Sequence, residues 1–149
     1  MAHFMFYAGK AYDYKQAKQL AQESLKKLGE DEYGVGWSIM KTANMNPVGE
    51  AIQDEYMQEY FDQYGPTYSA YSYEDLPSDK FGADFGANYF DPNSKQTFGE
   101  QLQNYFTNVL KATNPENAPN YKSLPSSYPP KGKKPSVQNL TTKPMFISE

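Results

Sequence analysis

Apolar side chains recur every three or four positions over several segments of the chain, a spacing typical of amphipathic helices. The first such segment runs from Asp13, which is expected to cap a helix, to Gly29, which is expected to end it. Residues 2–11 are more continuously apolar and contain Gly9. We therefore expect a separate, mostly buried helical turn there that leads into the first helix.

Two further helices are predicted before the middle of the chain. A short one is expected over residues 35–45, and a longer one begins at Asn46, which can cap a helix, and Pro47, which fits the first helical turn. Gly65 and Pro66 are expected to end it. The residues at helical spacing within it mix apolar side chains and carboxylates: Val48, Ala51, Ile52, Glu55, Tyr56, Glu59, Tyr60 and Tyr64.

The next predicted helix, which opens at Asp75 or Leu76, carries a ridge of rings beside a ridge of glycines. The rings lie four residues apart, as Phe81, Phe85 and Tyr89. Gly82 and Gly86 repeat at the same step, and each glycine costs about 1 kcal/mol of helix propensity relative to alanine. Close packing of another helix is the favoured interpretation, and a ligand lying against the bare backbone is the alternative.

The last predicted helix begins with a capping box formed by Thr97 and Glu100, after a turn over residues 91–94. Its expected buried face is Leu102, Tyr105, Phe106, Val109 and Leu110. Seven of the 11 prolines follow Ala112, so regular structure is expected to stop there. The sequence thus predicts a mostly α fold. Four to five helices form a small bundle in a domain over 1–112, and a Pro-rich extended strap over 113–149 docks partly on that body.

Composition restricts the chemistry further. A chain of 149 residues supports one core, and its 14 Tyr and 9 Phe predict that rings fill much of it. No cysteine is present and every basic residue is lysine, which excludes disulfides, thiolate nucleophiles and arginine clamps. His3 is the sole histidine, so a Ser/His/Asp site would have to use it, and a site with two imidazoles is excluded within one chain.

Charge is unevenly distributed along the chain. The formal net charge is −4, with the acidic excess in the body and a basic excess in the tail. The basic cluster Lys131, Lys133 and Lys134 lies in a Pro-rich stretch without interleaved rings, so we expect a solvated tail and no nucleic-acid partner. The apolar runs are too short to span a bilayer and no signal peptide is evident, so we expect a soluble chain, or an excised piece of one.

The candidate acid–base groups are His3, Asp79 and Asp84, provided that the fold brings them together. A hydrogen-bonded core position is the alternative for His3, because its neighbours in the sequence are apolar. Glu55, Glu59 and Asp62 share a helix face that could hold a hard cation, but a solvated stripe is the more ordinary interpretation. No metal ligand is therefore assigned, and the glycines match no phosphate-binding loop, which leaves the cofactor unknown.

Residues 72–90, 97–106 and 112–125, together with Thr141–Phe146, are similar to C-terminal domains of Rhs-type polymorphic toxin proteins of Bacteroidota. This resemblance covers about half the chain and brings no catalytic motif. It implies a secreted or delivered effector that acts in interbacterial competition and is countered by a cognate immunity protein.

A second likeness is to helical domains that pair an Ala-His-Phe segment with a later Asp-Leu-x-Ser/Ala-Asn-x-x-Gly. Ala2–Phe4 and Asp75–Gly82 match in order, with Asp79 where Asn is usual. This likeness implies that His3 and Asp79 approach one another across the bundle.

A non-catalytic protein-binding module is the alternative function, and the sequence leaves open whether the chain is an enzyme. The lack of Arg, Cys and a second His suits a binding module, and tyrosines gather around the end of the third predicted helix. The candidate partner-binding residues are Tyr64, Tyr68, Tyr71 and Tyr73, together with the C-terminal tail.

Overall fold

The computed structural model describes residues 1–28, 36–64, 71, 72, 74–112, 114 and 138–144. The helices of this part are α1 (Ala2–Leu28), α2 (Gly36–Asn44), α3 (Pro47–Asp62), α4 (Asp75–Asp84) and α5 (Phe98–Asn104). Two π-helical turns, η1 (Phe85–Tyr89) and η2 (Tyr105–Val109), continue α4 and α5. The described residues are mostly helical and contain no strand beyond one isolated bridge, which confirms the predicted fold class. None of these helices is both long and apolar enough to cross a membrane.

α1 is one uninterrupted helix, so the prediction of a separate turn over residues 2–11 and a helix start at Asp13 is wrong. The physical reason is burial, which continues at helical spacing through the N-terminal half. The buried residues there are Phe4, Tyr7, Ala8 and Ala11. Their packing outweighs the cost of about 1 kcal/mol for Gly9 within the helix. Burial is also less complete than expected, because Met5 and Phe6 are exposed.

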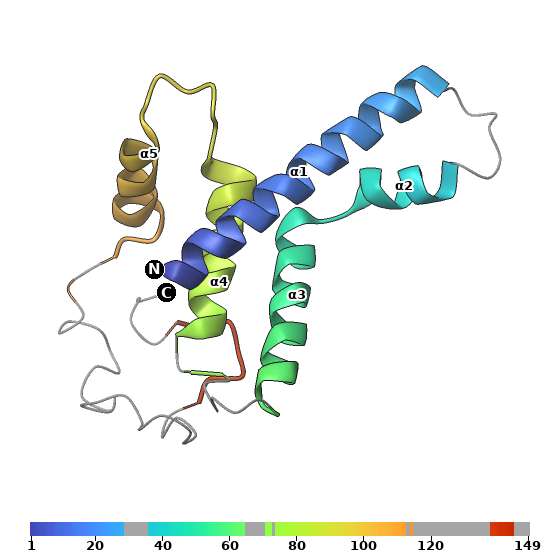
Figure 1. Cartoon of the computed structure of the whole chain (residues 1–149). Helices are drawn as coiled ribbons and strands as arrows, with labels where there is room; N and C mark the ends of the chain where they lie inside the picture. Colours follow the sequence, from blue (N-terminus) through green and yellow to red (C-terminus); the bar gives the residue numbers. More distant parts are fainter. Residues whose placement is uncertain (29–35, 65–70, 73, 113, 115–137, 145–149) are drawn as a thin grey trace.

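α1 crosses α4 (Figure 1), and the backbone of α1 lies directly against the two glycines of the α4 ridge. A Cβ atom added at Gly82 would lie 2.1 Å from the carbonyl oxygen of Phe4, and one added at Gly86 would lie 1.9 Å from that of Ala8. Both distances are far shorter than a carbon–oxygen contact permits. The glycine ridge is therefore an inter-helix contact, as the packing interpretation predicts.

In the part of the chain that the structure describes, the core consists of two clusters of buried side chains. Small residues dominate the first, where α1 meets α3, α4 and η1: Tyr7, Ala11, Ala51, Ala83 and Ala87. Rings dominate the second, where α1 meets η1 and η2: Phe4, Ala8, Phe85 and Tyr105. The ring-rich core predicted from composition thus lies on one side of α1. On the other side of α1, α3 packs through its alanine Ala51.

Tyr105 connects the last helical segment to α4. It is fully buried, and its hydroxyl lies 2.9 Å from Oδ2 of Asp84 and 3.1 Å from the carbonyl oxygen of Phe81. The ring of Tyr105 also lies 5.3 Å from that of Phe85, centroid to centroid. Both the hydrogen bonds and the ring contacts hold η2 against the end of α4.

The capping box predicted at the start of α5 is present, with Thr97 and Glu100 bonded to one another's backbone N–H groups. The predicted buried face is wrong at Val109, which is 37% exposed. Gln101 is buried instead, because its amide donates to the carbonyl oxygens of Asp91 and Gln96 at 3.0 Å each. A polar side chain that satisfies two turn carbonyls thereby replaces an apolar one.

Residues 138–144 lie beside the segment that precedes α4 (Figure 1). The N–H of Asn139 donates to the carbonyl oxygen of Tyr71 at 3.1 Å, and Ser72 forms an antiparallel bridge with Gln138. These contacts join the C-terminal region to the loop between α3 and α4. Most of the expected strap over 113–149 lies outside the described residues, and the division of the chain at 112/113 stays a prediction.

Candidate functional site

His3 and Asp79 meet where the N-terminal turn of α1 crosses α4. The Nδ1 atom of His3 lies 3.1 Å from Oδ2 of Asp79, whose side chain is fully buried. The side chain of His3 is 51% exposed, so the imidazole bridges the protein interior and the surface. The predicted approach of these two residues is confirmed, although they are 76 positions apart in the sequence.

The buried carboxylate controls the protonation of the imidazole. The hydrogen bond to Asp79 raises the pKa of His3 from 6.5 to about 9, against the opposing effect of burial, and the charges of Asp79, Asp75 and Glu59 raise it further. His3 is therefore an imidazolium at neutral pH. Nδ1 faces Asp79, and within the described part of the chain Nε2 has no hydrogen-bond partner.

Glu55 of α3 is buried next to this pair. It is 1% exposed, and neither of its carboxyl oxygens has a hydrogen-bond donor among the described residues; the same is true of Oδ1 of Asp79. Burial and the adjacent Asp79 carboxyl raise the pKa of Glu55 to about 11. The surroundings of Glu55 therefore favour the protonated, neutral form of its carboxyl group.

Two further carboxyl groups lie in the same region, and each accepts a backbone hydrogen bond. Glu59 of α3 is buried and accepts from the N–H of Tyr71, a residue with a positive φ of 58°. Asp75 of α4 accepts from the N–H of Ser72 at 3.1 Å. Burial raises the pKa of both carboxyl groups. The described end of the loop between α3 and α4 therefore supplies donors to this acidic region.

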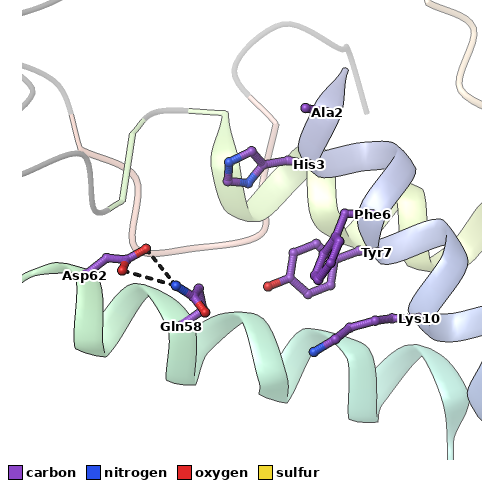
Figure 2. A pocket seen from close by; sticks show the side chains of 7 residues that line it. All are labelled: Ala2, His3, Phe6, Tyr7, Lys10, Gln58 and Asp62. Carbon is purple, nitrogen blue, oxygen red and sulfur yellow. Dashed lines mark hydrogen bonds between the residues drawn. The ribbon is translucent and has the colours of Figure 1, made fainter. Parts of the chain in front are cut away.

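The exposed side of His3 faces a cavity of about 340 Å³ between α1 and α3. Figure 2 shows its lining, with the α1 side chains opposite Gln58 and Asp62 of α3: Ala2, His3, Phe6, Tyr7, Lys10, Gln58 and Asp62. The hydroxyl of Tyr7 points into the space between the two helices, and burial raises its pKa, so it stays a neutral phenol. A cavity of this volume suits a small molecule or one side group of a polymer.

Lys10 lies at the far end of this cavity and connects α1 to α3. Its Nζ atom is 2.8 Å from Oδ2 of Asp54, which also accepts from the hydroxyl of Tyr14 at 2.6 Å. Burial opposes ionisation of Asp54, but these two hydrogen bonds prevail and lower its pKa. Lys10 also lies 5.5 Å from the ring centroid of Phe6. The ammonium group is therefore fixed at the cavity rather than extended into solvent.

The interpretation of the α3 acidic stripe as solvated is wrong for Glu55 and Glu59, which are buried. Ala51 is fully buried and lies four residues before Glu55, so the helix that inserts Ala51 also turns both glutamates inward. The feature of the sequence that indicates this burial is Ala51, which begins the stripe on the same helix face. Among the described residues, no group of three His, Asp or Glu side chains is arranged to hold a metal ion.

Asp84 does not join the predicted acid–base set. Its carboxylate lies against the hydroxyl of Tyr105 and also accepts from Nδ2 of Asn88 at 2.8 Å. Among the described residues no hydrogen bond connects Asp84 to His3 or Asp79. Its role is to hold η2, as described above. The physical reason is helix geometry: position 84 lies five residues after Asp79 and therefore points elsewhere.

The predicted partner-binding tyrosines fall in different places. Tyr64 is 75% exposed after the end of α3, and Tyr71 is half-buried at the loop contact with Glu59. Tyr68 and Tyr73 lie outside the described residues. Sequence reasoning missed three neighbours of the cavity, namely Tyr7, Lys10 and Gln58, because nothing in their spacing separates them from ordinary helix positions.

Comparisons with protein-family models, with curated protein sequences and with solved structures find no match to this chain.

Proposed function

We propose that this chain is a catalytic effector domain in which His3 acts as a general acid and Asp79 orients it. The observation that carries this proposal is the contact of a half-exposed imidazole with a fully buried carboxylate at the edge of a cavity. A hydrogen bond from one ring nitrogen to a carboxylate fixes the orientation of a histidine, and its second nitrogen is then presented to a substrate.

The electrostatics favour proton donation over proton abstraction. With a pKa raised to about 9 the imidazolium persists at neutral pH, so Nε2–H can donate its proton to the leaving oxygen or nitrogen of a bond undergoing cleavage. The product of that step is a neutral imidazole beside Asp79, which recovers its proton from solvent. The reaction class is therefore hydrolysis of a bond whose leaving group requires protonation: water bonds to the other fragment and releases a proton, which balances the one that His3 donates.

The cavity supplies groups that could orient such a substrate. The phenol of Tyr7 and the ammonium of Lys10 are donors on the α1 side, and Asp62 is an acceptor on the α3 side. The side chain of Gln58 already donates to Asp62 at 3.0 and 3.1 Å, so the carboxylate is held in place. The role of an effector itself is supported by the resemblance of residues 72–90, 97–106, 112–125 and 141–146 to the C-terminal domains of Rhs-type toxins.

Induced expression in a bacterial host without an immunity protein tests this function. We expect the wild-type chain to slow growth and His3→Gln to relieve the effect, since His3 is half-exposed and its replacement leaves the core intact. Asp79→Asn should relieve it as well. Leu20→Gln, at an exposed position of α1, is the matched control and should remain inhibitory. Normal growth with abundant folded wild-type protein, or equal inhibition by His3→Gln, would overturn the proposal.

A second candidate function, binding of a protein partner, is favoured by one observation. The solvent face of α3 and the turn that follows it carry a group of exposed large side chains, here called the α3 ring face: Tyr56, Met57, Tyr60, Phe61 and Tyr64. The rings of Tyr60 and Tyr64 lie edge to face with centroids 5.6 Å apart. Exposed aromatic groups of this kind are enriched in protein interfaces. This surface does not line the His3 cavity.

A further inference from the structure

Among the described residues, the carboxyl groups around His3 exceed the positive charge available to them; those of Glu55, Glu59 and Asp79 are buried, and that of Asp75 is partly buried. α3 contributes Glu55 and Glu59, α4 contributes Asp75 and Asp79, and α1 contributes His3 and the neutral phenol of Tyr7. Lys10 is already bound to Asp54. Burying several carboxylates against one imidazolium is strongly unfavourable, so at least one of the carboxyl groups must carry a proton.

The hydrogen bonds indicate where that proton resides. Glu59 accepts from the N–H of Tyr71, Asp75 accepts from the N–H of Ser72, and Asp79 faces the imidazolium through Oδ2. Within the described part of the chain, Glu55 has no donor at either oxygen and Asp79 has none at Oδ1. A proton on Glu55 converts it into a donor and gives Oδ1 of Asp79 the partner that it lacks.

We propose that Glu55 and Asp79 share one buried proton, and that Glu55 is the positioning residue that holds Asp79 toward His3. Protonated Glu55 donates to one oxygen of Asp79 and the imidazolium donates to the other. These two hydrogen bonds fix the Asp79 carboxylate between Glu55 of α3 and His3 of α1. The carboxylate therefore cannot rotate away from the imidazole ring. The catalytic part of this positioning role rests on the proposed function, whereas the shared proton does not.

The first test observes the proton directly in the purified protein. At pH 8 the infrared spectrum of the wild type should contain the carbonyl stretch of a protonated carboxylic acid, and Glu55→Gln should remove it. Asp62→Asn, which changes a carboxylate at the cavity wall, is the matched control and should leave that band in place. The absence of the band from the wild type, or its persistence in Glu55→Gln, would overturn the shared proton.

The second test uses the sole histidine of the chain, which gives one set of imidazole NMR signals. Glutamine keeps a donor and adds no charge, so in Glu55→Gln the pKa of His3 should stay within about half a unit of its wild-type value. A fall of a full unit or more would mean that Glu55 is ionised in the wild type and would overturn the proposal.

The positioning role is read from the Nδ1–H signal of His3. This proton should be protected from exchange in the wild type and in Glu55→Gln, and lost or broadened in Glu55→Leu, which removes the donor. Equal protection in a folded Glu55→Leu would overturn the positioning role. If Glu55→Leu does not fold, a Glu55→Gln protein that loses the signal would overturn it instead. None of these measurements depends on toxicity, so they separate this inference from the proposed function.

Discussion

A Cβ atom on Gly82 would lie 2.1 Å from the carbonyl oxygen of Phe4, so α1 and α4 meet as they do because position 82 has no side chain. Phe4 directly follows His3, and Gly82 lies about one helical turn after Asp79. The same contact that joins the two helices therefore places the imidazole over the buried carboxylate. The geometry of the His3–Asp79 pair therefore depends on a contact between two helix backbones in which neither of these side chains takes part.

Gly82→Ala should destabilise the protein by about 2 to 4 kcal/mol, because the added methyl group meets rigid backbone and forces the helices apart. The same separation should lower the pKa of His3 toward 6.5, since the hydrogen bond to Asp79 lengthens. Urea unfolding measures the first effect and NMR titration of His3 the second.

Gly9→Ala is the matched control for this substitution. A Cβ atom at Gly9 meets nothing within 4 Å, so this variant should be more stable than the wild type by up to about 1 kcal/mol through helix propensity. If Gly82→Ala proves as stable as Gly9→Ala, the close packing of α1 on α4 is refuted.

Tyr105→Phe should lower the free energy of unfolding by about 1 to 3 kcal/mol. The ring packing is retained, but Asp84 and the carbonyl oxygen of Phe81 lose their shared donor in a buried setting. Denaturant unfolding monitored by circular dichroism measures the change. Tyr89→Phe, at a neighbouring exposed ring, is the control and should change stability by less than about 0.5 kcal/mol. Equal stabilities of the two variants would contradict the role given to the Tyr105 hydroxyl.

Stability should fall as pH rises from 6 to 9. A folded-state pKa raised above the unfolded value stabilises the protein below the unfolded pKa and loses that contribution as the group deprotonates. For His3 the loss occurs between 6.5 and about 9. Glu55 acts in the same direction over a wider range, from 4.5 to about 11. The thermal midpoint should therefore be lower at pH 9 than at pH 6, and a higher midpoint at pH 9 would contradict the assignment.

His3→Gln separates the two contributions to this pH dependence. Solvent screens a half-exposed imidazole, so the His3 part amounts to about 1 kcal/mol or less, and the variant should show a correspondingly shallower fall between pH 6 and pH 9. The part of the remaining slope that comes from Glu55 should disappear when Glu55 is also changed to Gln. Unfolding midpoints of the single and double variants across this pH range give the comparison.

Substitutions on the α3 ring face should leave the fold intact. Phe61→Ser and Tyr64→Ser change exposed side chains, so each should alter the free energy of unfolding by less than about 0.5 kcal/mol. Ala51→Leu on the opposite face should cost about 1 to 3 kcal/mol through overpacking. Denaturant unfolding compares them, and a large loss at Tyr64 would show that the ring face belongs to the core and not to an interface.

Local patterns were sufficient for much of the fold. Three predicted features depend only on residues within one or two helical turns, and the structure has all of them: the helix start at Pro47, the capping box at Thr97 and the glycine ridge of α4. Such features depend on backbone preferences and nearest neighbours, which the sequence contains in full. The contact of His3 with Asp79 was predicted from a resemblance and not from spacing.

Tertiary structure alone decided which face of α3 is buried. The helix offers one stripe with Ala51, Glu55 and Glu59 and another with exposed rings, and hydrophobicity by itself favours the rings. The small Ala11 and Ala83 create a narrow gap that admits alanine, and the glutamates follow because they lie on the same face. The raised pKa of Glu55 depends on this burial and also on Asp79, which belongs to another helix. The ionisation of a buried group depends on partners distant in the chain, and so sequence spacing could not reveal it.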